Sequence, residues 1–175
     1  MSAPANGASR TDYTRSGRGV EHVARFIALF VAVLTVSLTA GRAFWVWIGE
    51  NPSHRSTTTF IESFQATNRV IAVPIAITGN LGFVSVLAAA ALSWHDRPSL
   101  YFLGTAAPLL AASVLITLMI NVPINDRIMT WNASSPPADW KQFRDRWWTW
   151  HVIRAAALLA ALVLLLFGAL LRRES

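Results

Sequence analysis

Four long apolar stretches alternate with shorter polar segments along the chain. They cover residues 24–48, 70–94, 100–122 and 152–171. At about 1.5 Å per residue, each is long enough to cross roughly 30 Å of hydrocarbon as a helix. Backbone polar groups inside lipid must be satisfied within their own segment, and no alternating strand pattern competes with helix. The pattern therefore predicts an all-α protein, an integral membrane four-helix bundle.

Two polar segments lead into apolar stretches without a break. "FIESFQATNRVI" (residues 60–71) precedes the second stretch, and "DWKQFRDRWWTWHVIRAA" (residues 139–156) precedes the fourth. We interpret both as amphipathic helical entries before the second and fourth membrane helices. Residues 23–173 are then expected to form a single transmembrane domain. Residues 1–22 are rich in Ser, Gly and Arg and lack apolar periodicity, so they are predicted to be a disordered tail.

Composition supports a membrane location and narrows the partners. With 54% hydrophobic and 14% charged residues among 175, the chain has more apolar surface than a soluble core of this size could bury. The formal charge of +6 comes from basic residues next to the membrane segments, so membrane lipids are expected as partners and nucleic acid is not. The absence of cysteine excludes disulfides and a cysteine nucleophile.

Four spans place both termini on one side of the membrane. Basic residues number seven on the terminal side and eight on the other, so counting alone does not orient the protein. Because the eight are interspersed with acids or lie inside helical patterns, we expect cytoplasmic termini in a bacterial inner membrane. Seven of the eight tryptophans fall on the non-terminal side. They either anchor the helices at the interface or wall an aromatic pocket.

Polar residues follow one face of the second and fourth helices into the membrane. Glu62, Gln65 and Arg69 are spaced by three and four residues, with Asn68 adjacent. The fourth helix repeats the pattern with residues spaced by three, four and three and with Trp148 beside them: Arg144, Trp147, His151 and Arg154.

A third polar group lies in "NVPINDR", where the third helix should leave the hydrocarbon. Asn121 and Asn125 are four residues apart, and Pro123 between them is expected to interrupt the helical hydrogen bonds. We interpret this segment as the proline-broken rim of a polar chamber. Asn121 and Asn125 would point inward, and Asp126 with Arg127 would mark the water boundary.

Buried polar groups of this kind have a structural and a functional interpretation. Charges at this depth cost about 2.5 to 3.5 kcal/mol each on insertion scales, so they should face the bundle interior and pair. They could simply lock the helices together, but interhelical hydrogen bonds contribute only about 0.6 kcal/mol each, which favours a functional site. Burial and neighbouring positive charge favour the neutral, proton-accepting form of His151. No HxxxH or ExxH pair is present, so no metal site is expected.

Three blocks give the chain a family resemblance: "FIESFQATNRVIAVP" (residues 60–74), "NVPINDRI" (residues 121–128) and "WKQFRDRWWTWHVIRAA" (residues 140–156). In their order and spacing they resemble the anthrone oxygenase-like family of small four-helix membrane proteins, over roughly residues 24–171. The resemblance implies oxidation of an anthrone to an anthraquinone by dioxygen, without a conventional redox cofactor. Family members often have asparagine at the position of His151, so a base there would not be shared by all of them.

The resemblance also implies roles for the polar groups, because such a reaction needs a base, an oxyanion partner and a dry aromatic slot. His151 or Glu62 would take the proton, and Arg69 and Arg154 with the asparagines would hold the enolate. The substrate, a hydrophobic aromatic small molecule, would contact six residues, the two asparagines included: Asn68, Asn121, Asn125, Trp147, Trp148 and Arg144.

The residues alone leave a second hypothesis open. The chain could be a non-catalytic membrane subunit or a small-molecule-binding protein whose polar cluster is structural. A pocket wide enough for fused rings beside a neutral His151 would favour the enzyme, whereas tight packing there would favour the alternative. The sequence does not decide the natural substrate or the oligomeric state.

Overall fold

The computed structural model describes the backbone of residues 10–171 and the side chains of residues 19–171. It is helical almost throughout, with α1 (Arg10–Gly49), α2 (Thr57–Ala91), α3 (Arg97–Ile116), α4 (Val122–Met129) and α5 (Trp140–Leu170). A short 3₁₀ turn, η1 (Pro52–His54), follows α1, and a π-helical turn, η2 (Thr117–Asn121), joins α3 to α4. Four helical stretches are long and apolar enough to cross a membrane: Gly19–His54, Thr57–Ala91, Arg97–Met129 and Trp140–Leu170. The predicted four-helix membrane bundle is confirmed.

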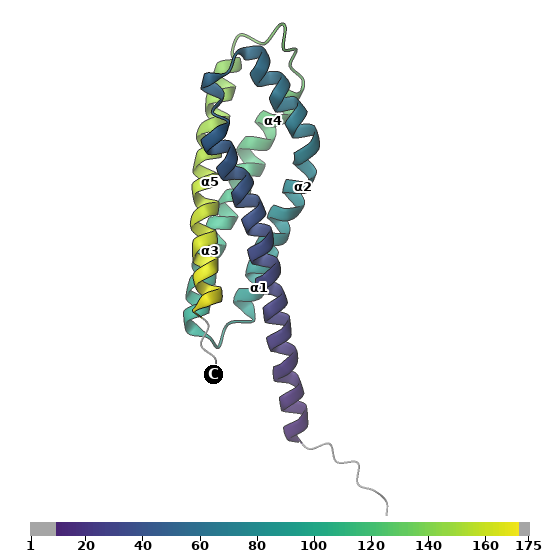
Figure 1. Ribbon diagram of the computed structural model, residues 1–175, viewed down its shortest axis with the longest axis vertical. Coiled ribbons are helices and arrows are strands. Elements are labelled where there is room, and N and C mark those ends of the chain that lie inside the picture. Colours follow the sequence, from purple (N-terminus) through teal and green to yellow (C-terminus); the bar gives the residue numbers. More distant parts are fainter. Residues whose placement is uncertain (1–9, 172–175) are drawn as a thin grey trace, which may run out of the picture.

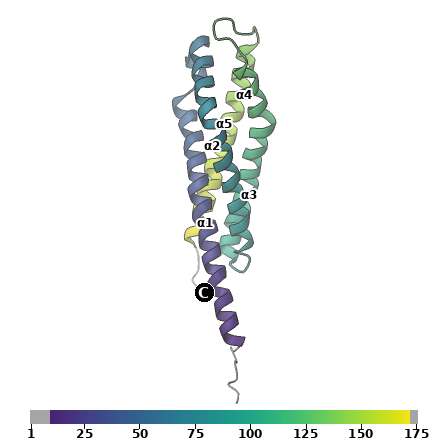
Figure 2. The ribbon, with the colours of Figure 1, turned by 90° about the vertical axis from the view of Figure 1, so that its right-hand side faces the viewer.

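The long helices pack side by side in a ring. α1 contacts α2 and α5, and α3 contacts the same two helices from the opposite side (Figures 1 and 2). The N-terminal part of α1 extends past the other helices at the end where α5 finishes (Figure 1). The structure places residues 10–22 in α1, so this helix begins earlier than the expected tail allowed, and residues 1–9 lie outside the described residues.

The amphipathic entries belong to the same helices as the spans that follow them. α2 runs unbroken from Thr57 and α5 from Trp140, as the continuous patterns predicted. Ser56 starts α2, because its side chain accepts a hydrogen bond from the Thr59 N–H at 3.2 Å. Gln65 then donates to the carbonyl oxygens of Ile128 and Trp131, both at 2.9 Å, and so ties the α2 entry to the end of α4.

α1 and α2 approach each other closely at Gly82. A Cβ atom there would lie 3.0 Å from Thr35 Oγ1 and 3.0 Å from Val36 Cγ2. Small residues let membrane helices approach in this way, because lipid gives helices little hydrophobic reason to associate. Toward the end of the bundle away from the termini the two helices diverge (Figure 1).

Replacing Gly82 with valine is therefore expected to destabilise the bundle by roughly 1–3 kcal/mol, because the added atoms overpack a close helix contact. The matched control is Gly104→Val in α3, where an added Cβ meets nothing within 4 Å. Thermal unfolding in detergent would measure both. Equal midpoints for the two variants would contradict the close packing at Gly82.

Prolines shape the helices around the interior. Pro74 lies inside α2 and Pro108 inside α3, and neither ring nitrogen can donate to the carbonyl four residues earlier. Pro123 follows the π-helical turn, in which the Val122 N–H donates to the Thr117 carbonyl. The helix therefore widens by one residue instead of breaking, which corrects the expected interruption. Such π-turns often occur at functional sites.

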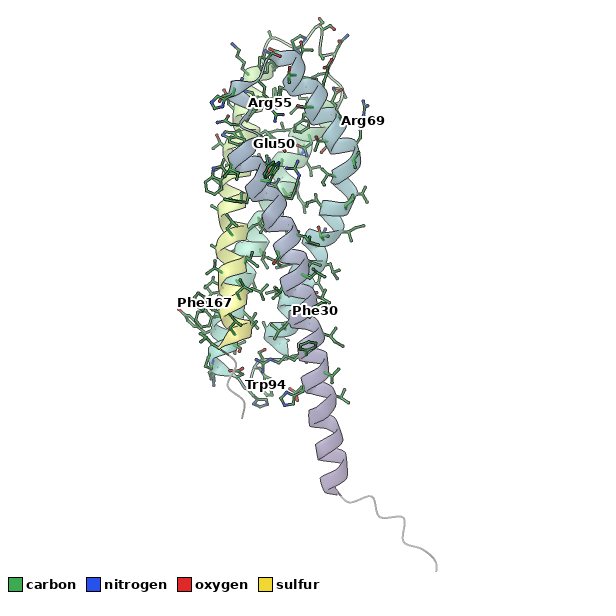
Figure 3. The ribbon with its side chains drawn as sticks, in the orientation of Figure 1. Phe30, Glu50, Arg55, Arg69, Trp94 and Phe167 are labelled. Atoms are coloured by element: carbon green, nitrogen blue, oxygen red, sulfur yellow. The ribbon has the colours of Figure 1, made fainter. Side chains whose placement is uncertain are left out.

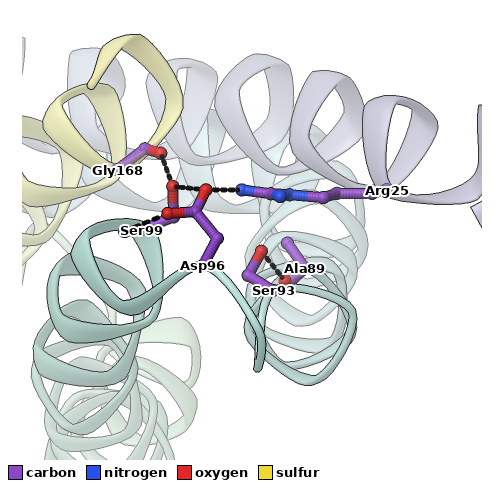
Figure 4. A network of polar contacts seen from close by, with 6 residues as sticks. All are labelled: Arg25, Ala89, Ser93, Asp96, Ser99 and Gly168. Atoms are coloured by element: carbon purple, nitrogen blue, oxygen red, sulfur yellow. Dashed lines mark hydrogen bonds and ion pairs between the residues drawn. The ribbon is translucent and has the colours of Figure 1, made fainter. Parts of the chain in front are cut away.

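A buried ion pair joins three elements at the terminal end of the bundle. Arg25 of α1 donates from Nη2 to Oδ2 of Asp96 at 2.6 Å, and both side chains are largely buried. The Ser99 hydroxyl lies 2.8 Å from Asp96 Oδ2 and 2.9 Å from the Gly168 carbonyl oxygen of α5 (Figure 4). Asp96 also precedes α3 and accepts from the Ser99 N–H at 3.5 Å. We call Arg25, Asp96 and Ser99 the terminal clamp.

Candidate functional site

A cavity of about 240 Å³ lies among the helices in the half of the bundle away from the termini. Its wall combines an apolar majority with many polar groups, and it is formed by side chains of α1, α2, α3, η2, α4 and α5. This volume is somewhat below the roughly 300–1,000 Å³ of common ligand pockets, but the cavity shares their mostly apolar wall with a few polar groups, so it suits a small organic molecule. Six of the ten residues singled out from the sequence line it: Asn68, Asn121, Asn125, Trp147, His151 and Arg154.

His151 is buried, and both of its ring nitrogens are engaged. Nε2 lies 3.1 Å from the carbonyl oxygen of Ala43 in α1, and Nδ1 lies 3.0 Å from Nη2 of Arg154. Arginine can only donate, so Nδ1 accepts and the proton of the neutral ring is on Nε2, where it is donated to Ala43. His151 can therefore take up a proton at Nδ1 only after Arg154 has moved. In this arrangement the ring positions Arg154.

Arg154 reaches the cavity from the middle of α5. Besides His151, it contacts Thr117, whose hydroxyl accepts from Nη1 at a long 3.4 Å. Its Nε is buried without a hydrogen-bond partner among the described residues. A guanidinium has five N–H donors, so one imidazole and one weak hydroxyl contact leave several of them able to bind a ligand.

The two asparagines of the "NVPINDR" segment face inward, as the sequence predicted. Asn121 is fully buried and donates to the Trp147 carbonyl oxygen at 3.3 Å. Asn125 accepts from Trp147 Nε1 at 2.8 Å, while its own Nδ2 is 3.5 Å from Asn68 Oδ1. That last contact is at the outer limit of a hydrogen bond, so Asn125 Nδ2 can donate to a ligand at little cost. Asp126 and Arg127 are exposed.

Aromatic rings form one side of the site. The Trp147 and Trp148 rings lie nearly parallel to the His151 imidazole, at centroid distances of 5.0 and 6.0 Å. Phe64 of α2 meets the edge of Trp147 at 5.3 Å. Trp147 lines the cavity, whereas Trp148 is outside its lining and supports His151 instead.

Three charged cavity residues were absent from the sequence-based site: Arg42, Glu50 and Arg55. Arg42 Nη1 lies 3.3 Å from Glu50 Oε1, and Arg55 donates to the Ser63 hydroxyl at 2.9 Å. Among the described residues that line the cavity, Glu50 alone carries a carboxylate. Of these three, Arg42 could have been found from the sequence. It lies inside the first apolar stretch, and a charged residue at membrane depth is by default a candidate for function.

Glu62 and Arg69, by contrast, lie outside the cavity. Both are exposed, and neither belongs to the cavity lining. Figure 3 shows Arg69 on the outer side of α2, whereas Glu50 lies near the end of α1 beside the bundle interior. The structure thus separates Glu62 and Arg69 from His151 and Arg154, and the catalytic roles predicted for them have no geometric support.

Arg144 is also separate from the cavity. Its guanidinium pairs with the neighbouring Asp145 at 2.8 Å and lies over the Trp140 ring at 5.0 Å. The predicted contact with substrate is therefore not formed from this position. In the part of the chain that the structure describes, no three histidine, aspartate or glutamate side chains gather into a metal site.

Comparison with known proteins gives one match. The family model described as anthrone oxygenase matches residues 60–164, which includes the cavity residues of α2, α3, η2, α4 and α5. Arg42, Glu50 and Arg55 lie before the matched segment. No curated protein and no solved structure matches the chain.

Proposed function

The chain belongs to the anthrone oxygenase family, and from this premise we propose that it is a membrane-embedded oxygenase acting on a lipid-soluble, anthrone-type aromatic substrate. One observation supports this above the others: a cavity between membrane helices combines an apolar wall with loosely bonded polar donors and a carboxylate. A flat polycyclic substrate partitions into the bilayer, so a site between the spans matches where such a molecule resides.

In the reaction we propose, the anthrone and one dioxygen give the quinone and one water, and no further reductant is needed. The methylene group of the anthrone loses one proton to a base, and the resulting delocalised anion transfers electrons to dioxygen and forms a carbon–oxygen bond. Protonation of the distal oxygen gives a hydroperoxide. Loss of the second hydrogen of that carbon, as a proton, with cleavage of the oxygen–oxygen bond, gives the quinone carbonyl and one water. These reaction steps require no bound cofactor.

Glu50 is better placed than His151 to take the first proton. Its carboxylate lines the cavity and has one contact at 3.3 Å, with Arg42, so Oε2 has no partner among the described residues. The acceptor nitrogen of His151 already binds Arg154. Base catalysis needs the acceptor within hydrogen-bond reach of the proton, and a substrate in the cavity can approach Glu50 without displacing Arg154.

The asparagines supply the donors for the negative charge that develops on the substrate oxygen. Asn125 Nδ2 has only its 3.5 Å contact with Asn68, and Asn121 fixes the adjacent turn to α5 through Trp147. Donors held in place in a water-poor site stabilise an oxyanion strongly, because they need no reorganisation during the reaction. Arg154 adds positive charge to the same space. The Trp147 ring offers an apolar surface to the fused rings.

For the location, we propose a bacterial inner membrane with cytoplasmic termini. The eight basic residues on the non-terminal side include Arg42, Arg55 and Arg154 of the cavity. Setting aside these three and the buried Arg25 of the terminal side leaves five basic residues on the non-terminal side and six on the terminal side, and the side with more basic residues is expected in the cytoplasm.

The proposal is tested by oxygen uptake and quinone formation. Protein purified in detergent is incubated with a panel of anthrones under air and under nitrogen. We expect quinone to form faster than in protein-free micelles, with about one dioxygen consumed per quinone. Quinone formation at the protein-free rate for every anthrone would favour a non-catalytic binding protein.

A cavity-blocking variant ties the activity to this site. Ala72 lines the cavity, and Ala72→Trp is expected to abolish most turnover because the indole occupies much of a 240 Å³ space. The control is Val73→Trp, next to it on the outer side of α2, where Val73 is 68% exposed and outside the cavity lining. Equal turnover by the two variants would place the reaction elsewhere.

A further inference from the structure

The cavity has more positive than negative charge. Three guanidinium groups line it, from Arg42, Arg55 and Arg154, but the described lining includes one carboxylate, that of Glu50. His151 accepts a hydrogen bond at Nδ1 and is neutral in this arrangement. Glu50 forms its ion pair with Arg42. The lining of the cavity therefore carries two positive charges in excess.

Two of these guanidinium groups have no carboxylate within ion-pair distance among the described residues: that of Arg55, which lies between the first two spans, and that of Arg154, which lies inside the fourth. The contacts of Arg154 are the neutral His151 and Thr117. Arg42 lines the same cavity and adds a further positive charge to it. A charge inside a membrane bundle is expensive unless it is paired, and here the available partners leave it unpaired.

We propose that the ligand of this cavity carries a permanent carboxylate, which binds the guanidinium of Arg154. This inference rests on the proposed function, since it specifies the substrate class of the same site as an aromatic acid. A transient enolate would compensate Arg154 only during turnover, whereas an acid substituent neutralises it as soon as the ligand binds. The ketone oxygen of the substrate is then left to Asn121 and Asn125.

The shape of the partner follows from the same contacts. A guanidinium presents planar, paired N–H donors that match the two oxygens of a carboxylate, and these charge-assisted bonds are among the strongest in proteins. The rest of the wall is mainly apolar and includes Leu110 and Leu158. The cavity thus suits a rigid apolar body with one acidic end. His151 orients the arginine toward that end and serves as a positioning residue.

The test compares two fluorescent probes of equal ring size, anthracene-9-carboxylate and the neutral anthracene-9-methanol. Their dissociation constants are measured at pH 8 with wild-type protein in detergent, and with Arg154→Gln and Arg146→Gln. Arg146 is an exposed arginine of α5 outside the cavity lining, so it controls for loss of a positive charge. We expect the preference for the carboxylate to fall by about tenfold or more in Arg154→Gln and to stay unchanged in Arg146→Gln.

Micelle partitioning affects each probe equally in all three proteins, so the change in preference reports on Arg154. Thermal unfolding of the wild type provides a measurement that needs no variant. At equal probe concentrations the carboxylate should raise the unfolding midpoint more than the alcohol does. An equal or larger rise with the alcohol, or the same preference in Arg154→Gln as in wild type, would overturn the proposal.

Binding and turnover separate this inference from the proposed function. Oxidation of neutral anthrones with no carboxylate preference would leave the oxygenase standing and refute the acid-binding role of Arg154. An Arg154-dependent preference for the carboxylate without quinone formation would support the acid site and refute the oxygenase.

Discussion

Replacing Glu50 with glutamine is expected to lower kcat for oxidation of an anthrone-type substrate by roughly 100-fold to 10,000-fold, the usual contribution of a general base. Glutamine preserves the size and most contacts of the side chain but cannot accept a proton at neutral pH. The reason lies in the cavity, where Glu50 supplies a carboxylate while the acceptor nitrogen of His151 is bound by Arg154. Stopped-flow or steady-state measurement of quinone formation gives kcat and KM separately.

Two matched variants distinguish a base from a structural carboxylate. Glu62→Gln alters an exposed glutamate outside the cavity and should leave kcat near the wild-type value. Arg42→Gln breaks the same 3.3 Å ion pair but leaves the Glu50 carboxylate in place. If Arg42→Gln lowers kcat as much as Glu50→Gln, the ion pair matters and the proton acceptor lies elsewhere. If Glu62→Gln is the damaging change, the geometric assignment is wrong.

The membrane spans and the polar residues between them could be predicted from the sequence. The length of the apolar stretches identifies the spans, and the helical spacing of the polar residues identifies the faces that carry them. Asn121, Asn125, His151 and Arg154 were expected to face inward, since charges and amides at membrane depth avoid lipid. The structure places all four around one cavity. The family suggested by the three sequence blocks was also confirmed by the match over residues 60–164.

The side of the helix on which a polar residue faces its neighbours was harder to predict than its depth in the membrane. Glu62 and Arg69 share a helical face with Gln65. On that face Gln65 contacts the end of α4 through the Ile128 and Trp131 carbonyls, whereas Glu62 and Arg69 are exposed. Their position near the membrane edge lets both side chains reach water, so burial was not forced on them. Spacing within one helix cannot show which neighbour each face meets.

Glu50 was missed for a different physical reason. It lies just after α1, beyond the apolar run, where a carboxylate ordinarily marks the water boundary. The 3₁₀ turn η1 and the divergence of α1 from α2 instead place it against the cavity. The widened turn before Pro123 was likewise unforeseen, because a proline signals a lost hydrogen bond without showing how the chain compensates.

The second large effect is expected at the terminal clamp. Asp96→Asn should destabilise the bundle by roughly 3 kcal/mol or more, because it leaves the buried Arg25 guanidinium without its counter-charge. Asparagine still caps a helix well, so the start of α3 should survive. The double variant Arg25→Met with Asp96→Asn should recover part of the loss. The control is Asp139→Asn in the exposed Arg127–Asp139 pair, where we expect a change of less than about 1 kcal/mol.

Acid should reproduce this loss in the wild type. Burial raises the pKa of Asp96, but hydrogen bonds from Arg25 and Ser99 and the charge of Arg25 outweigh it, so the pKa lies below the ordinary 3.8. A group whose pKa is lowered by folding stabilises the fold above its unfolded value, and that contribution disappears as the pH falls through the folded value. Unfolding midpoints in detergent should therefore drop below about pH 4 more steeply for wild type than for Asp96→Asn. Parallel profiles for the two proteins would show that the carboxylate of Asp96 carries no linkage to folding, and the clamp would then stabilise through shape alone.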